Sequence, residues 1–567
     1  MHQIDWIVLA LTIFAIVAYG ILKTRGKKDL QTYLLGSKEL KWWTIGLSIM
    51  ATQASAVTFL STTGQGFDDG MRFAQFYIGL PIAMVILSVF FLPIYYRLNV
   101  STAYEYLEER FDLRMRTFAA VLFLIQRGMA AGLTIAAPAI VLSTILGWSW
   151  WSTNILLGVL VLIYTVFGGG KAVSVTQQQQ MVIILIGMIT ALVIMVSKLP
   201  DNVHFTDALA LSGKLGKLNV INFKFDWRDK YTFWSGMIGG VFLFLSYFGT
   251  DQSQVQRYLR GKSLTESKLG LLFNGMIKLP MQFLILLVGV MMFIFYQYHK
   301  APIHFNEKNV ATLQNSVLHD QFAQVQQRYD LNFEEKKAGA DVLLTALKTN
   351  NQTTIESARQ HIFDLRLEEK VLRDSVKQMI KTAAPDADIR DRDYAFLTFV
   401  MGNLPRGLVG FLLAVIFSAA MSSSASELNA LATTTMIDIY RRQIRPDDTD
   451  EHYTYLAKWF TVLWGGLILV FATFATFFSN LIEAVNIVGS LFYGTILGIF
   501  LVGFFFKLIH ARAVFIGAII GESVVISVYT IYGWHDPGFP FLWLNPLGCL
   551  VTIGAAFIAQ KFQPTLL

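Results

Sequence analysis

One ten-residue stretch in the second half of the chain reads F-S-A-A-M-S-S-S-A-S, from Phe417 to Ser426. It lies in the middle of an apolar segment, Gly407 to about Ile439, which is long enough to cross a bilayer. Hydroxyl groups at that depth are costly unless they find a polar partner, because hydrocarbon offers none. The stretch therefore predicts a membrane helix that carries a polar site.

The spacing of the polar atoms indicates what this site could bind. In a helix, the carbonyl of Ala419 and the hydroxyls of Ser422 and Ser423 share one face and can converge on one small ligand. Hard oxygen ligands suit Na⁺, and two carbonyls from a second, broken helix would complete a cage of five oxygens. The alternative is that the small residues only let two membrane helices pack closely.

Composition places the chain among polytopic membrane proteins. Of its 567 residues 54% are hydrophobic and 14% aromatic, and apolar blocks longer than about 18 residues recur from end to end. The net charge of +7 comes from short basic loops between these blocks, which indicate topology and no nucleic-acid partner. The single cysteine, Cys549, excludes an intrachain disulfide.

We expect thirteen membrane spans: residues 4–22, 40–64, 71–97, 115–146, 150–167, 173–196, 231–249, 269–298, 407–439, 455–478, 481–506, 511–532 and 541–559. Basic residues concentrate in the loops on one side, such as Arg25, Arg97 and Arg257. This asymmetry predicts a multi-pass protein of the cell membrane, in contact with its lipids, with an extracytoplasmic N-terminus and a cytoplasmic C-terminus.

The segment between the eighth and ninth spans has a different texture. It is densely charged, and its apolar residues recur at helical spacing, as at Phe363, Leu365, Leu367, Val371 and Leu372. We expect an extracytoplasmic helical insertion at 299–393, and a solvated spacer without chemistry is the plainest interpretation of it.

Two spans contain polar interruptions at mid-depth. The second span has Ala51-Thr52-Gln53-Ala54-Ser55-Ala56-Val57-Thr58, and the seventh has Ser246-Tyr247-Phe248-Gly249-Thr250-Asp251-Gln252. Unwound backbone inside a membrane is tolerated where it lines a protein cavity, and its carbonyls can then bind cations. Two interrupted spans five helices apart are typical of a transporter built from inverted repeats.

At these residues the chain resembles the sodium:solute symporter family. The matching blocks are Trp42-Trp43 with the polar run to Ser55, residues 91–98, 102–111 and 164–173, Gly249-Thr250-Asp251-Gln252 with residues 255–259, and residues 422–429. The residues in these blocks are most similar to those of the branch that includes the iodide, monocarboxylate and multivitamin carriers. The resemblance implies an all-α, leucine-transporter-like fold of 5+5 inverted repeats.

The implied organisation has five parts. They are an extra N-terminal helix and cytoplasmic loop (1–39), the first repeat with the start of the second (40–298), the insertion (299–393), the rest of the second repeat (394–506) and two C-terminal helices (507–567).

The resemblance also implies a sodium site and the positions of a solute site. The sodium ligands would be the carbonyls of Ala51, Ala54 and Ala419 and the hydroxyls of Ser422 and Ser423, which agrees with the helical face described above. The solute-lining positions correspond to Gln53, Thr58, Gln75, Tyr77, Leu80, Phe244, Tyr247, Phe248 and Lys278. Lys278, an intramembrane cation, suits a carboxylate or another small anion, or it pairs or snorkels within the bundle.

One position departs from the family pattern. Gln177 stands in the run Thr176-Gln177-Gln178-Gln179-Gln180, where an intramembrane aspartate is usual. Because a carboxylate would offset the charge of a second cation, we expect one Na⁺ per solute.

The sequence predicts a sodium-coupled symporter, with Na⁺ as the coupling ion, that imports a small solute, most simply an organic anion such as a monocarboxylate. The alternatives are a sodium/sugar symporter and a transporter-like sensor. A membrane-embedded enzyme is not expected, because the chain has no zinc-binding His-Glu-x-x-His helix and no Gly-x-Ser-x-Gly elbow.

Overall fold

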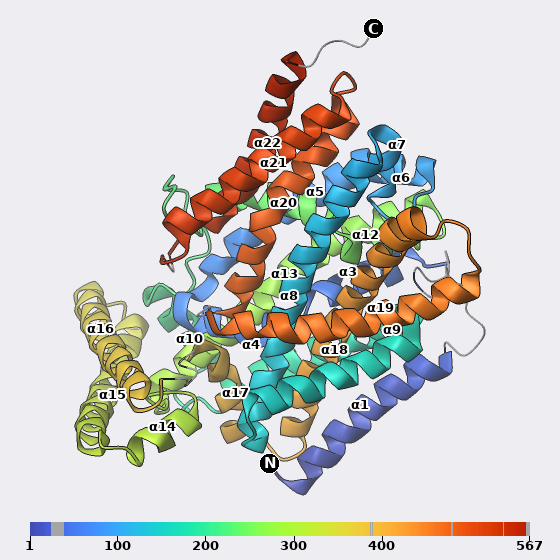
Figure 1. Cartoon of the computed structure of the whole chain (residues 1–567). Helices are drawn as coiled ribbons and strands as arrows, with labels where there is room; N and C mark the ends of the chain where they lie inside the picture. Colours follow the sequence, from blue (N-terminus) through green and yellow to red (C-terminus); the bar gives the residue numbers. More distant parts are fainter. Residues whose placement is uncertain are drawn as a thin grey trace.

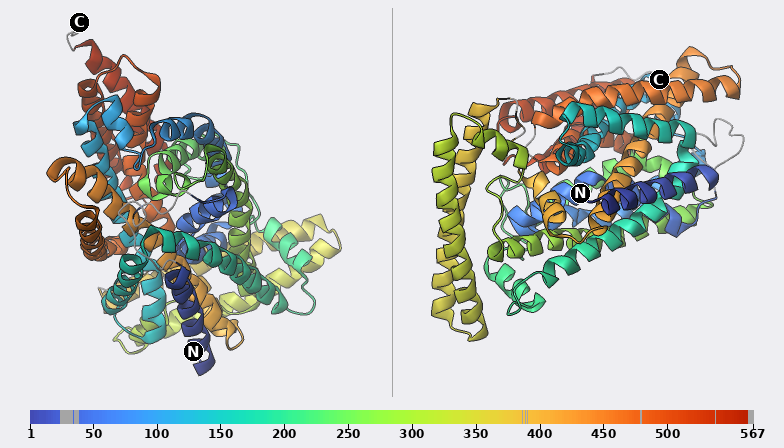
Figure 2. Two further views of the ribbon diagram at one scale, coloured as in Figure 1. Left: turned by 90° about the vertical axis from the view of Figure 1, so that its right-hand side faces the viewer. Right: turned by 90° about the horizontal axis from the view of Figure 1, so that it is seen from below.

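The computed structural model describes residues 1–23, 34, 39–385, 387, 389, 391–477, 480–536 and 538–562. Most of the predicted cytoplasmic loop after the first helix, including Arg25, lies outside these residues. The described chain is helical, and Leu40 and Gly261 form its one isolated β-bridge. The helices gather into one elongated bundle. A long helical hairpin, α15 and α16 at residues 319–383, lies across one end (Figures 1 and 2).

The helices up to the hairpin are α1 (Gln3–Lys23), α3 (Trp42–Gln53), α4 (Ala56–Asp69), η1 (Gly70–Tyr77), α5 (Gly79–Ile86), η2 (Leu87–Phe91), α6 (Leu92–Leu98), α7 (Glu105–Arg110), α8 (Leu113–Leu146), α9 (Trp150–Ser197), α10 (Phe205–Lys214), η3 (Ser235–Gly239), α11 (Gly240–Gly249), α12 (Gln252–Tyr258) and α13 (Leu264–Tyr298). The rest are α14 (Glu307–Gln314), α15 (His319–Lys348), α16 (Gln352–Ala383), α17 (Arg392–Asn403), α18 (Leu408–Thr434), η4 (Thr435–Ile444), α19 (Asp450–Phe471), η5 (Ala472–Phe477), α20 (Leu481–Phe505), α21 (Ala511–Val528), η6 (Tyr529–Gly533), η7 (Phe541–Trp543) and α22 (Leu544–Lys561).

Nine helical stretches in the described residues are long and apolar enough to cross a membrane, and three shorter apolar helices accompany them. The structure differs from the predicted spans at two places. The boundary expected between residues 64 and 71 lies inside one helical stretch of 43 residues, Ala56–Leu98. Residues 150–167 and 173–196, expected as two spans, form the single 48-residue helix α9. It is about 72 Å long at 1.5 Å per residue. The glycines at 168–170 do not end it, since glycine disfavours a helix only modestly and no proline interrupts this one.

The helix that carries the serine stretch is the innermost one. In its most apolar window 89% of residues are buried inside the protein, against 22% for the neighbouring helix α19. Because α18 is surrounded by protein, its hydroxyls face other helices and not lipid. Helix α19, by contrast, presents most of its apolar surface outward, as expected for a helix at the lipid boundary.

Both predicted interruptions are real breaks. Helix α3 ends at Gln53 and α4 begins at Ala56, while α11 ends at Gly249 and α12 begins at Gln252. Ala54 has φ −86° and ψ 74°, outside helical values. Asp251 caps α12 by accepting hydrogen bonds from Ser253 N at 2.9 Å and Ser253 Oγ at 2.6 Å. The two breaks supply free backbone groups in the interior of the bundle.

Candidate functional site

The first break lies directly beside the serine face of α18. Ser423 Oγ is 3.5 Å from the carbonyl oxygen of Ala51. Two ligands of one hard cation, each about 2.4 Å from it and at right angles, are about 3.4 Å apart, so this spacing suits a shared ion. Ser422 Oγ is buried and has no hydrogen-bond partner among the described residues. A buried hydroxyl oxygen without a hydrogen-bond partner is available to coordinate a cation.

The direction of α3 favours a cation at the same point. Ala51 lies in the last turn of α3, whose final carbonyls have no helical N–H to accept from, and Ala54 follows as its C-cap. The C-terminal end of a helix also carries a partial negative charge. The five predicted ligands thus come from two elements that meet, α3 with its C-cap and α18, although their role as sodium ligands remains a prediction.

Gln177 fills the neighbouring space. Its Oε1 accepts from Ser48 Oγ at 2.6 Å, and its Nε2 donates to Ser426 Oγ at 2.6 Å and to Thr52 Oγ1 at 3.1 Å. The side chain is fully buried and ties α9 to α3 and α18. An amide that donates toward these hydroxyls occupies their lone pairs, which a cation would otherwise use.

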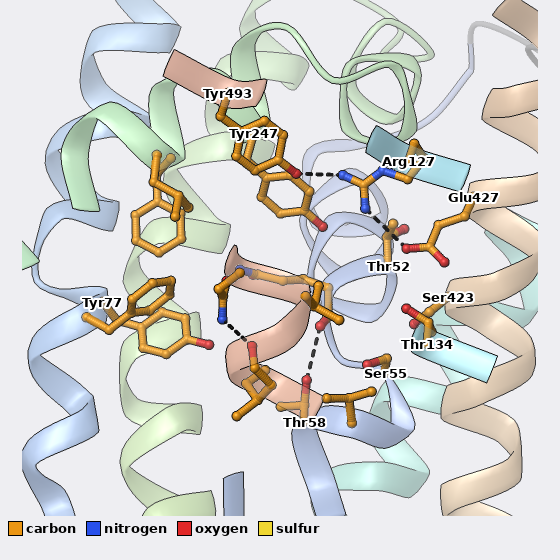
Figure 3. Close-up of a pocket in the computed structure, with 18 residues that line it drawn as sticks. Thr52, Ser55, Thr58, Tyr77, Arg127, Thr134, Tyr247, Ser423, Glu427 and Tyr493 are labelled. Atoms are coloured by element: carbon orange, nitrogen blue, oxygen red, sulfur yellow. Dashed lines mark hydrogen bonds and ion pairs between the residues drawn. The ribbon is translucent and has the colours of Figure 1, made fainter. Parts of the chain in front are cut away.

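A cavity of about 70 Å³ opens next to the serine face (Figure 3). Ser423 belongs to the serine face and also lines the cavity, so the cation and solute sites would touch. Five of the predicted solute-lining residues do line this cavity: Gln53, Thr58, Tyr77, Phe244 and Tyr247.

Four predicted solute residues lie elsewhere, and one of them, Leu80, is buried on α5. Gln75 accepts from the backbone N–H of Asn222 at 2.7 Å and donates to the carbonyl of Tyr231 at 2.9 Å, which anchors a loop. Phe248 packs in the core with its ring centroid 4.8 Å from that of Tyr247. Lys278 is fully buried on α13, does not line the cavity, and has no hydrogen-bond partner for Nζ among the described residues.

A buried charge cluster that the sequence analysis missed forms one wall of the cavity. Arg127 of α8 pairs with Asp251 at the second break and, at 3.2 Å, with Glu427 of α18. Its Nη2 also donates to the hydroxyl of Tyr493 at 2.8 Å. Arg127 and Glu427 are the charged residues among the described side chains that line the cavity. Figure 3 shows the two side chains converging beside Thr52.

The cluster changes one expectation about the solute. None of the solute-lining positions implied by the resemblance is acidic, but Glu427 lines the cavity and its Oε2 has no described hydrogen-bond partner. Arg127 is an intramembrane cation, a signal that could have been flagged in the fourth predicted span. Its two acidic partners, 124 and 300 residues away in sequence, could not have been inferred from that signal.

Comparison with known proteins identifies the class. The model of the sodium:solute symporter family matches residues 33–318 and 376–521, and the chain belongs to this family. It is a sodium-coupled symporter and a multi-pass membrane protein, with Na⁺ as the coupling ion.

Individual relatives are more distant. The chain is 25% identical to the human sodium-coupled monocarboxylate transporter 2 over 93% of its own length and 72% of that protein. It is 30% identical to the human sodium/iodide cotransporter over 52% of its length and 45% of that protein. The structure of a Na⁺-coupled sialic acid symporter in a substrate-bound outward-open state superposes with a TM-score of 0.74, at 20% identity, covering 99% of this chain and 98% of that one. The fold is the leucine-transporter-like one that the sequence predicted.

Proposed function

We propose that this symporter imports a small monocarboxylate together with one Na⁺, which binds between Ala51, Ala54, Ala419, Ser422 and Ser423. The observation that carries the proposal is the position of Ser423, which faces the Ala51 carbonyl on one side and the solute cavity on the other. A cation there adds positive charge beside the cavity, and each ligand then favours binding of the other.

The size of the cavity supports a small solute. About 70 Å³ holds roughly five or six water-sized groups. A three-carbon carboxylate has six non-hydrogen atoms, whereas a hexose has twelve. The curated relatives named above carry monocarboxylates and iodide, which are small anions as well.

We propose Arg127, and not Lys278, as the group that meets the solute's carboxylate. Its guanidinium reaches the cavity, and its contact with Glu427 is one that a second carboxylate could replace. The pairing with Asp251 would remain and hold the guanidinium in place.

The test is uptake into proteoliposomes. An inward Na⁺ gradient should drive accumulation of labelled pyruvate, and unlabelled lactate should compete while glucose does not. Na⁺-driven glucose uptake that pyruvate leaves unchanged would favour the sugar alternative. Binding of solute without any flux would favour the sensor.

The stoichiometry follows from Gln177, whose amide bridges Ser48, Thr52 and Ser426 without a negative charge. We expect one Na⁺ for each monocarboxylate, and hence no net charge moved. Each additional Na⁺ would add about 2.3 kcal/mol of driving force per 100 mV. Flux ratios measured at several membrane potentials should not depend on voltage, and a steep dependence would indicate two Na⁺.

The basic loops favour the predicted orientation, with the N-terminus outside, the C-terminus in the cytoplasm and the hairpin on the outer face. Chemical labelling of a cysteine introduced in α16, with a reagent that does not cross the membrane, tests this.

A further inference from the structure

A second and larger cavity lies where the helical hairpin meets the bundle. It has a volume of about 330 Å³ and is lined by the end of α4, the outer end of α13 and the inner face of α16. Figure 2 shows the hairpin of α15 and α16 lying across the end of the bundle at this point. Helix α4 connects the two cavities, since Thr58 lines the inner one and Phe67 the outer one, about 14 Å further along the helix.

Cations outnumber carboxylates in the lining, seven against five among the described residues. Several are already paired. Glu369 joins Lys336 at 2.5 Å and Arg373 at 3.0 Å, Arg373 also reaches Asp391, and Arg392 pairs with Asp68. Burial alone would raise the pKa of Glu369, but Lys336 and Arg373 lower it to about 2, so Glu369 is ionised at neutral pH.

Two cations of the lining, Lys217 and Arg366, form no ion pair within the described residues, although the charges of Asp68, Asp69 and Glu369 act on them. Lys217 is 3% exposed, and its Nζ donates hydrogen bonds to the carbonyls of Phe67 and Asp68. Its Nζ lies 4.3 Å from the ring centroid of Phe293, and the guanidinium of Arg366 lies 4.9 Å from the same centroid. Within the described residues Arg366 contacts this ring, and Glu369 and Asp68 act on it through their charge without a direct ion pair.

Both positive charges therefore gather around one aromatic ring. Burial and the charge of Arg366 outweigh the carboxylates of Asp68 and Asp69 and lower the pKa of Lys217 to about 7. An anion between the two cations would remove this repulsion and restore the charge of Lys217. The nearby rings of Phe67, Phe293 and Phe305 offer an apolar surface for the rest of a ligand.

We propose that the hairpin cavity is a second binding site, separate from the transport cavity, for a small organic carboxylate with an apolar or aromatic group. Its carboxylate contacts Arg366 and Lys217, and its apolar part lies against Phe293. The family model leaves residues 319–375 unmatched, a range that contains α15 and most of α16 with Arg366. The proposal does not depend on which solute is transported.

The site has a direct mechanical connection to transport. Lys217 holds the end of α4 through Phe67 and Asp68, and its own carbonyl accepts from Met71 N at 2.8 Å. A carboxylate on Lys217 and Arg366 would link α4 to α16 and restrain the half-helix that begins at the sodium site.

The experiment measures binding of para-fluorobenzoate to the full-length protein in detergent, by fluorine NMR line broadening, in a Na⁺-free choline buffer. Wild type should bind it, and Arg366→Gln should weaken binding about tenfold, as expected for one lost charged hydrogen bond. The matched control is Arg359→Gln, about two turns earlier on α16 and outside the cavity lining, where the arginine pairs with exposed Glu356 at 2.8 Å. This variant should bind like wild type.

Three results would overturn the proposal. They are absence of broadening with wild type, equal affinity in wild type and Arg366→Gln, and loss of binding in Tyr247→Ala with full binding in Arg366→Gln. The last result would put the probe in the transport cavity.

Discussion

The two cavities differ in the origin of their residues and in their charge balance. The inner cavity is lined by residues within the ranges that match the family model, and its one lining cation among the described residues, Arg127, is matched by carboxylates. The hairpin cavity takes much of its wall from residues that the model does not match, and it carries unmatched positive charge. The comparison suggests that the shared bundle performs coupled transport, while the added hairpin contributes an independent anion site.

The largest expected effect breaks the inner charge cluster. Arg127→Gln leaves Asp251 and Glu427 buried without their cation, which should cost about 3–5 kcal/mol and abolish uptake. Arg373→Gln is the matched change in the hairpin, where Glu369 keeps Lys336 as a partner. We expect it to lower the melting temperature less and to leave Na⁺-driven uptake active. Equal damage from both variants, in melting curves and uptake, would remove the distinction between the two regions.

A smaller change sharpens the assignment of the anion. Glu427→Gln removes the carboxylate that competes for Arg127 but keeps its shape, so the apparent affinity for pyruvate should rise about tenfold. A polyhydroxylated solute would instead lose a strong acceptor and bind more weakly. The concentration dependence of uptake in Glu427→Gln distinguishes an anionic from a polyhydroxylated solute. Asn486→Asp, a change at another residue that lines the same cavity, is measured in the same way.

The smallest effect is expected at Lys278, which the sequence suggested as an anion contact. Because this lysine is buried on α13 away from the cavity lining, Lys278→Met should leave the half-saturating pyruvate concentration within about twofold of wild type. A tenfold increase with normal Na⁺ binding would return Lys278 to the solute site.

The sequence was informative where polarity interrupts an apolar span. The runs at 51–58 and 246–252 predicted the two breaks, since polar residues inside a membrane must line a cavity. Helical spacing also brought Ala419, Ser422 and Ser423 to one face. It could not reveal which faces of other helices meet. The pairing of Arg127 with Asp251 and Glu427 and the orientation of Lys278 depend on tertiary packing, which no local pattern encodes.

The hairpin was predicted to be helical from the spacing of Phe363, Leu365, Leu367, Val371 and Leu372. Leu365 and Leu372 are buried, whereas the other three side chains are more than half exposed. The interior of the hairpin uses Ile355, Ile362 and Leu365. The periodicity thus gave the helix and only part of its buried face, and the cavity behind it depends on contacts between segments far apart in the chain.

The most direct test of the central claim is the Na⁺ dependence of pyruvate uptake in Ser423→Ala proteoliposomes, with Ser424→Ala as the control on the next face of α18. The variant removes one ligand oxygen, which the hydrocarbon surroundings cannot replace. The half-saturating Na⁺ concentration should therefore rise at least about tenfold. The control should match wild type. An unchanged Na⁺ dependence in Ser423→Ala, with the variant folded and reconstituted at wild-type levels, would contradict the sodium site between α3 and α18.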